Sequence, residues 1–154
     1  MKTLIYIPTI YRDQKGSWPP TTPSCWYYSW QKYLYNYLSK QSYNVIWKAG
    51  PRTSNLIDPI KYFKSKNIRY SEKKLSRELK KVDFALVDTL STPTMECLIK
   101  NIPCLCLLFF DYDFLIDDDY GDFKGIFRIN KIEDRNFILA YNKIEEFYQE
   151  IYGK

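Results

Sequence analysis

The residues best suited to chemistry stand in one turn between a short apolar run and the start of a helix. The run at 84–87 is typical of a strand buried on both faces, and the polar residues 88–92 follow it directly. Pro93 suits the first turn of a helix, and Thr92 is the expected N-cap. The unpaired N–H groups of a helix start bind anions. The equally open interpretation is that Thr92 only caps a structural helix.

Two cations stand at the end of another predicted strand, 44–48. Lys48 and Arg52 lie on either side of Gly50. A cation pair that faces the helix start would suit a diphosphate, because the side chains supply charge and the N–H groups supply directional donors. The alternative is that both are surface cations in a loop.

A carboxylate lies one turn into the same helix. Glu96 would accept both hydroxyls of a ribose, or would only complement the positive end of the helix dipole. The predicted contacts of a nucleotide ligand are therefore Lys48, Arg52, Ser91, Thr92, Thr94 and Glu96.

Apolar runs and helical periodicity alternate along the whole chain. Strands are predicted at 4–7, 44–48, 68–70, 84–87, 104–109 and 126–129, and helices at 25–41, 59–66, 71–81, 93–100 and 133–152. This alternation predicts an α/β fold: one Rossmann-like domain over 1–154, with a parallel sheet of about six strands and helices on both faces. In such sheets a ligand lies beyond the carboxyl ends of the strands, where the strand order reverses.

Three helices have predicted apolar faces. For 25–41 the face comprises Trp26, Trp30, Tyr33, Leu34, Tyr37 and Leu38. For 71–81 it comprises Leu75, Leu79 and Val82, and for 133–152 it comprises Phe137, Ile138, Tyr141, Ile144, Phe147, Tyr148 and Ile151.

The chain has no histidine, which excludes Ser-His-Asp and Cys-His mechanisms within it and argues against ordinary zinc sites. The four cysteines form no Cys-x-x-Cys pair, so reduced, buried thiols are expected at Cys25, Cys97, Cys104 and Cys106. The aspartates of 111–122 lack the ligand spacing of a calcium loop, so a solvated acidic loop is favoured and no metal is expected.

Charge is unevenly distributed. Residues 1–81 contain 16 Lys and Arg against 4 Asp and Glu, and residues 82–154 contain 7 against 14. A basic half favours phosphate-bearing ligands or acidic membrane surfaces, unless it is only solvated helix surface. With no membrane-spanning run and no secretion signal, we expect a cytoplasmic protein, with peripheral association at the inner face of the membrane as an option. No nucleic-acid recognition motif is present.

The segment VDTLSTPTMECL at 87–98, followed by Asn101-Ile102-Pro103, resembles a segment of bacterial surface-carbohydrate transferases of the GT-B type. Residues 4–11 resemble the strand that opens their carboxyl-terminal domain, and 45–52 resemble their segment that ends in Pro-Arg. The polyol-phosphate transferases of teichoic-type polymers have a comparable stretch. The resemblance covers nearly the whole chain. It departs at Thr89, where the family has an aromatic residue, and at Ala49-Gly50, which replace a bulkier dipeptide.

The resemblance implies the lobe that binds a nucleotide-activated donor for surface polysaccharide biosynthesis, with no cofactor besides this substrate. It assigns Ser91 and Thr92 to the diphosphate, Glu96 to the ribose, and Lys48 with Arg52 to the phosphates. The acceptor lobe of such enzymes is not seen in this sequence, so a separate acceptor-lobe protein is an expected partner. Alone, the chain is expected to bind a nucleotide and to turn over slowly or not at all.

Two other functions stay open. The chain would be a non-catalytic subunit that docks on a full transferase through exposed aromatics at Trp18, Trp26 and Trp30. It would otherwise be a receiver-like or flavodoxin-like signalling domain with Asp88 as phospho-acceptor. The absence of an acidic pair after the first strand disfavours this last hypothesis.

Overall fold

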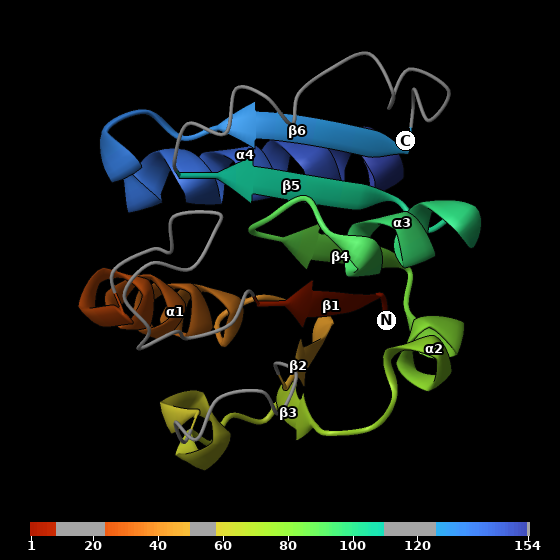
Figure 1. Ribbon diagram of the computed structural model, residues 1–154, viewed down its shortest axis with the longest axis horizontal. Helices are drawn as coiled ribbons and strands as arrows, with labels where there is room; N and C mark the ends of the chain where they lie inside the picture. Colours follow the sequence, from red (N-terminus) through yellow and green to blue (C-terminus); the bar gives the residue numbers. More distant parts are fainter. Residues whose placement is uncertain (9–23, 50–57, 110–125, 154) are drawn as a thin grey trace.

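The computed structural model describes residues 1–8, 24–49, 58–109 and 126–153, except the side chains of Ser24, Cys25 and Arg135. The described strands form one six-stranded sheet in the order β3-β2-β1-β4-β5-β6, and every pairing is parallel (Figure 1). Their bounds are β1 Thr3–Ile7, β2 Asn44–Lys48, β3 Ile68–Ser71, β4 Phe84–Val87, β5 Cys104–Leu108 and β6 Phe127–Lys131. The predicted α/β, Rossmann-like class is confirmed, and each strand lies within two residues of its predicted bounds.

Helices cover both faces of the sheet. Helices α1 (Ser24–Leu38) and α4 (Phe137–Tyr152) pack on one face, and α2 (Leu75–Glu78) and α3 (Thr92–Ile99) pack on the other. Alternate residues of each strand point to opposite faces. In β1, Leu4 and Tyr6 therefore join the core under α1 and α4, whereas Ile5 and Ile7 join the core under α2 and α3.

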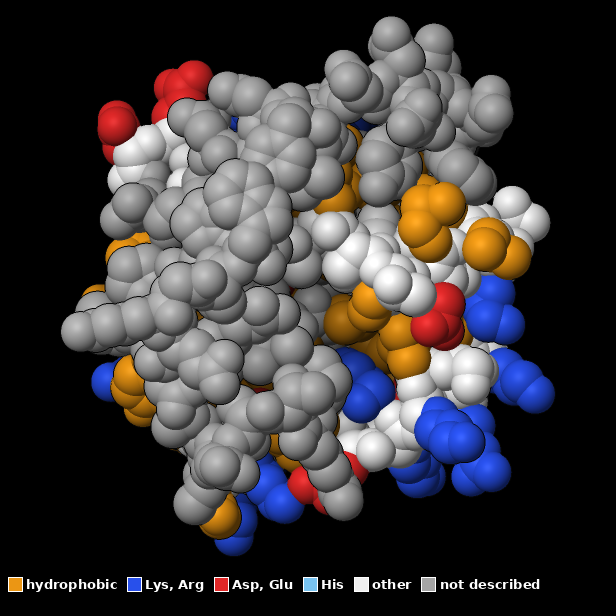
Figure 2. Space-filling view, viewed as in Figure 1, with side chains coloured by type: hydrophobic (Ala, Val, Ile, Leu, Met, Phe, Trp, Pro, Cys, Tyr) orange, Lys and Arg blue, Asp and Glu red, His pale blue; other side chains and the backbone are white. Residues whose placement is uncertain are grey.

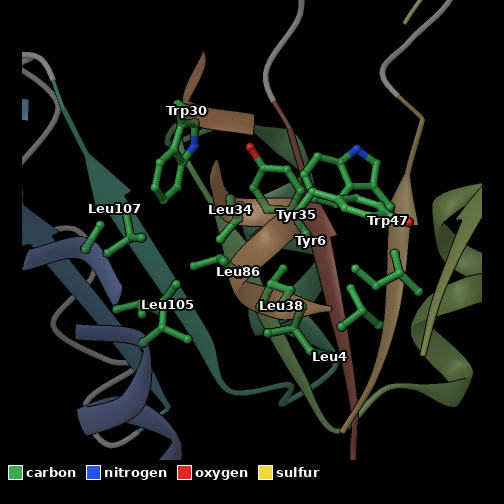
Figure 3. Packing of buried hydrophobic residues seen from close by; sticks show 14 of the residues in the cluster. Leu4, Tyr6, Trp30, Leu34, Tyr35, Leu38, Trp47, Leu86, Leu105 and Leu107 are labelled. Carbon is green, nitrogen blue, oxygen red and sulfur yellow. The ribbon is translucent and has the colours of Figure 1, made fainter. Parts of the chain in front are cut away.

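The core under α1 and α4 is rich in aromatic side chains (Figure 3). Tyr6 and Trp47 meet edge to face with ring centroids 4.5 Å apart, and Trp30 lies 4.5 Å from Phe109. Such pairs stabilise a core beyond the area that they bury. The aromatic content of the sequence therefore serves packing in this face.

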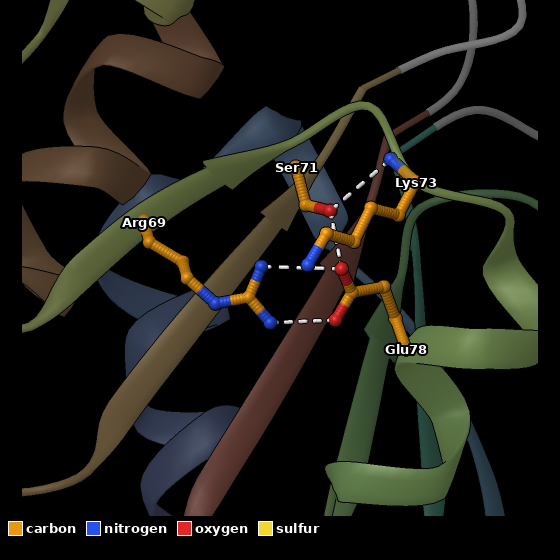
Figure 4. Close-up of polar contacts among 4 residues, drawn as sticks. All are labelled: Arg69, Ser71, Lys73 and Glu78. Atoms are coloured by element: carbon orange, nitrogen blue, oxygen red, sulfur yellow. Dashed lines mark hydrogen bonds and ion pairs between the residues drawn. The ribbon is translucent and has the colours of Figure 1, made fainter.

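The polar cluster of Arg69, Ser71 and Glu78 joins edge strand β3 to α2 (Figure 4). The Arg69 guanidinium donates two hydrogen bonds to the Glu78 carboxylate, and the Ser71 hydroxyl donates a third. The Glu78 side chain is only 3% exposed. These donors lower the pKa of Glu78 to about 2, with the hydrogen bonds from Arg69 as the largest cause. A buried carboxylate thus holds the short α2 against the sheet edge.

Several helices are shorter than predicted. The predicted helix 59–66 is one 3-10 turn at Pro59–Tyr62, although Asp58 caps it as expected by accepting from the Ile60 N–H at 3.0 Å. The predicted helix 71–81 loses its first residues to β3 and an extended link, leaving α2 and a 3-10 turn at Leu79–Lys81. Asn101 ends α3 in the left-handed conformation, with φ 54°.

The buried faces of α1 and α4 differ in part from the prediction. In α1, Tyr33 is 54% exposed and Tyr27 is buried in its place. In α4, Ile138 is 69% exposed and Ala140 is buried. Trp30 is fully buried, so the expectation that it is an exposed docking residue is wrong. Trp26 is half-buried against Phe109 and Phe137.

Cys97, Cys104 and Cys106 are free and buried, as predicted. Among the residues that the structure describes, no helix has the length and apolar character needed to cross a bilayer.

Candidate functional site

The strand order reverses between β1 and β4. Ile7 pairs with Val87, so the carboxyl ends of the two strands lie side by side. The chain leaves β1 toward α1 on one face, and it leaves β4 toward α3 on the other. In open parallel sheets this reversal creates the crevice in which ligands bind. The candidate site therefore lies at this switch point, where the turn that the sequence singled out begins.

A carboxylate held by two tyrosines occupies this point. Asp88 follows β4 directly, and its Oδ2 accepts hydrogen bonds from the hydroxyls of Tyr6 in β1 and Tyr27 in α1, each at 2.6 Å. The two hydroxyl oxygens lie 3.5 Å apart. Tyr6 and Tyr27 are almost completely buried. This Tyr6–Tyr27–Asp88 cluster ties α1 to both strands of the switch point through short, charge-assisted bonds.

The protonation states of Tyr6 and Tyr27 suit a structural role for this cluster. Burial raises the pKa of Tyr6 and of Tyr27 well above the usual tyrosine value, and the negative charge of Asp88 raises both further. Both hydroxyls therefore stay protonated and donate at neutral pH. Burial likewise raises the pKa of the Cys106 thiol, with a second contribution from the charge of Asp88. Because two tyrosines hold the Asp88 carboxylate, the geometry does not favour a phospho-acceptor role for it.

Helix α3 starts at Thr92, one residue earlier than predicted. Ser91 is the N-cap in place of Thr92, and Thr94 completes a capping-box arrangement three residues later. The Thr94 Oγ1 accepts from the Ser91 N–H at 3.3 Å and donates to the Thr89 carbonyl at 3.2 Å. Thr94 is fully buried. Its hydroxyl therefore fixes the shape of the turn from inside.

This helix start offers fewer N–H donors than the sequence suggested. Pro93 has none, the Ser91 N–H bonds to Thr94, and the Thr94 N–H returns to the Ser91 carbonyl at 2.9 Å. The Thr92 N–H has no partner among the described residues, and the hydroxyls of half-buried Ser91 and exposed Thr92 stand beside it. A ligand at this point would meet one backbone donor and two hydroxyls.

Glu96 lies on α3 one turn beyond this start. It is half-buried, and its carboxylate makes no hydrogen bond or ion pair with the residues that the structure describes. A carboxylate in this position can accept hydrogen bonds from the hydroxyl groups of a ligand without breaking an existing contact with these residues.

Lys48 ends β2 on the face of the sheet that also carries Glu78. Its Nζ donates to the Ala49 carbonyl at 2.9 Å. Burial lowers the pKa of Lys48, and the charges of Glu78 and Glu72 oppose that shift. Strand β1 lies between β2 and β4, so the strand that Lys48 ends and the strand that leads to Ser91 are about 10 Å apart. Arg52 lies outside the described residues.

The candidate residues thus lie at one edge of the sheet but come from two separate elements. Ser91, Thr92, Thr94 and Glu96 come together at the β4–α3 turn, and Lys48 stands two strands away. Sequence reasoning missed Tyr6 and Tyr27. The signal for them is a tyrosine inside an otherwise aliphatic buried strand, because a buried tyrosine hydroxyl needs a partner.

In the part of the chain that the structure describes, no three His, Cys, Asp or Glu side chains form a group that could hold a metal ion. The aspartates of 111–122 lie outside it. Comparison with protein-family models and with curated proteins gives no match.

Proposed function

We propose that this chain binds a nucleoside diphosphate-activated donor at the switch point, as the donor lobe of a glycosyltransferase or polyol-phosphate transferase of the GT-B type. The observation that carries the proposal is the reversal of strand order between β1 and β4, with the β4–α3 turn at the edge where the strands end. The sequence resemblance described above independently favours the same turn as the diphosphate contact.

Each polar group at this edge has a role in the proposal. The Thr92 N–H and the hydroxyls of Ser91 and Thr92 bind the diphosphate, and Glu96 binds the ribose hydroxyls. Lys48 supplies positive charge from β2, together with Arg52. Thr94 acts indirectly, because its buried hydroxyl holds the turn in shape.

The chemistry in this proposal is the stabilisation of a departing diphosphate. Hydroxyl and N–H donors with one or two cations offset the charge that develops on the leaving group, and the fold orients the donor for attack. The acceptor and its lobe come from another protein or another part of the enzyme.

Calorimetric titration of the chain with UDP, CDP, GDP and ADP tests the binding. We expect one of them to bind, with about a tenfold loss of affinity in Glu96→Gln, because a charge-assisted hydrogen bond contributes that much. Lys48→Met and Arg52→Met are expected to weaken the diphosphate contact. Lys80→Met is the matched control, because Lys80 is exposed and lies before the start of β4, at the opposite edge of the sheet from these groups. If none binds at millimolar concentration, the proposal is wrong.

The docking-subunit alternative has lost part of its basis, because Trp30 is buried and Trp26 is half-buried. Pull-down of a full transferase by a chain that binds no nucleotide would favour it.

A further inference from the structure

A cavity of about 510 Å³ opens at the amino edge of the sheet, opposite the switch point. It lies beside the starts of β1, β2 and β3, and its polar lining includes Thr3, Asn44 and Asn67. Val45, Ile46 and Ile68 also line it, but their side chains are buried in the two cores. The volume is within the range of pockets that hold small molecules. None of the proposed donor-binding residues lines it.

Three cations from separate elements line this cavity: Lys66 before β3, Arg69 in β3 and Lys81 at the end of the 3-10 turn after α2. No acidic residue is among the lining residues. Lys66 and Lys81 are exposed and make no ion pair with the residues that the structure describes. Two uncompensated positive charges therefore face one space.

Arg69 contributes donors more than net charge. Its guanidinium is paired with Glu78 through two hydrogen bonds, and its side chain is 48% exposed. A guanidinium has further N–H groups beyond those two. The buried Glu78 fixes the orientation of Arg69, so its remaining donors are presented without further ordering.

The turn that carries Lys66 is also held in place. The Asn67 side-chain amide donates to the carbonyls of Leu38, Gln41 and Tyr43, at 2.9 to 3.2 Å. Its Oδ1 accepts from the Ser65 hydroxyl at 2.8 Å. These bonds attach residues 65–67 to the end of α1, so the backbone under Lys66 is ordered before any ligand arrives.

Among the residues that the structure describes, two acidic groups near this edge are already engaged. Glu78 is paired with Arg69, and Asp83 accepts from Lys2 and from the Thr3 N–H. The nearby surface adds positive charge, since Arg77 in α2 and Lys80 in the 3-10 turn are exposed. Figure 2 shows Lys and Arg side chains gathered at the lower right, over this part of the molecule. The field at the cavity therefore favours anions.

We propose that this amino-edge cavity is a binding site for a phosphate monoester, in which Lys66 and Lys81 balance the dianion and Arg69 donates hydrogen bonds to its oxygens. The proposal is independent of the donor site at the opposite edge. The same headgroup chemistry occurs on soluble phosphate esters and on phosphatidic acid in a bilayer.

Phenyl phosphate is the soluble probe, followed by amide chemical shifts in the folded chain. We expect saturable shifts at Thr3, Asn44 and Asn67, and about a tenfold weaker affinity for each of Lys66→Met and Lys81→Met. Phenyl sulfate, a monoanion of similar shape, is expected to bind more weakly. Affinity for phenyl phosphate is expected to rise between pH 5.5 and 7, as the phosphate loses its second proton at a pKa of about 6.

Vesicles that contain phosphatidic acid, compared with phosphatidylcholine vesicles, identify a membrane-borne source. The ligand is identified as a lipid headgroup if the chain binds phosphatidic acid vesicles but not phenyl phosphate. In that case Lys66→Met and Lys81→Met must weaken the binding to the vesicles. The control Lys80→Met lies beside the cavity but does not line it, and is expected to behave as the unaltered chain. The proposal is overturned if neither probe binds, or if both lysine variants bind as the unaltered chain does. Glu96→Gln is expected to leave this site unchanged, which separates it from the donor site.

Discussion

The charge on Glu78 should contribute to the free energy of unfolding, and this contribution should be lost in acid. The substitution Glu78→Gln tests this. The carboxylate is 3% exposed and accepts from Arg69 and Ser71, which holds its pKa at about 2 against an ordinary value of 4.5. A native pKa below the unfolded one means that the folded state prefers the charged form. The contribution is therefore complete above pH 4.5 and is lost as the pH falls from 4.5 toward 2.

The size of the effect follows from the shift in pKa. A difference of about 2.5 pKa units corresponds to roughly 3 kcal/mol of unfolding free energy. Arg69 is half-exposed and solvent screens its charge, so we expect the lower part of a range of about 2 to 3 kcal/mol. Glutamine keeps the volume and one acceptor, and it removes the charge. At neutral pH, Glu78→Gln should therefore be less stable by about this amount.

Urea unfolding followed by tryptophan fluorescence, repeated from pH 7 to pH 2.5, measures the difference between the two proteins. Other carboxylates titrate in both proteins and cancel in this difference. The deficit of Glu78→Gln should shrink as the pH falls below 4.5. Glu72→Gln is the matched control, since Glu72 is 44% exposed and pairs with exposed Lys61, and it should cost less than about 1 kcal/mol. A deficit that is the same at pH 7 and pH 2.5 would refute the reasoning.

Three further substitutions test other contacts by the same unfolding measurement. Tyr27→Phe removes one of the two tyrosine donors to Asp88 and should lower the free energy of unfolding by about 1.5 to 3 kcal/mol. Tyr33→Phe, on the exposed side of the same helix, should change it by less than about 0.5 kcal/mol. Equal effects of the two substitutions would contradict a stabilising role of the Tyr6–Tyr27–Asp88 cluster. Thr94→Val leaves the β4–α3 turn without its internal hydroxyl and should cost about 1 to 2 kcal/mol, and no loss would mean that the hydroxyl is dispensable. Asn67→Ala frees three carbonyls, should cost about 2 kcal/mol and should speed amide hydrogen exchange in 38–43; unchanged exchange would argue against it.

The strands were predictable because their signal is local. A run such as Phe84–Val87 is apolar at every position, and a strand with both faces covered needs no alternation to be recognised. The position of the candidate turn followed from the same pattern, since the polar residues after 87 had to lie at the carboxyl edge. The register that brings Ile7 beside Val87 was not accessible, because parallel pairing joins residues far apart in the sequence.

The buried face of α1 could not be read from hydropathy. Aromatic residues occupy so much of this helix that two stripes look equally apolar, one with Tyr33 and one with Tyr27. Packing against the sheet and α4 selects the second, in which Tyr27 reaches Asp88. The sequence predicted a helix here, and the tertiary contacts decided its rotation about its own axis.

The sequence by itself determined the class of fold, the edge of the sheet at which the hydroxyl-rich turn lies, and the absence of histidine chemistry. Those properties depend on composition and on short-range periodicity, which every folded state of this chain must satisfy. Only the tertiary structure decided that Thr94 is turned inward, that Asp88 is held by two tyrosines, and that Lys66, Arg69 and Lys81 line one cavity. The direction of a side chain and its neighbours depend on contacts between elements distant in sequence, and no local pattern contains that information.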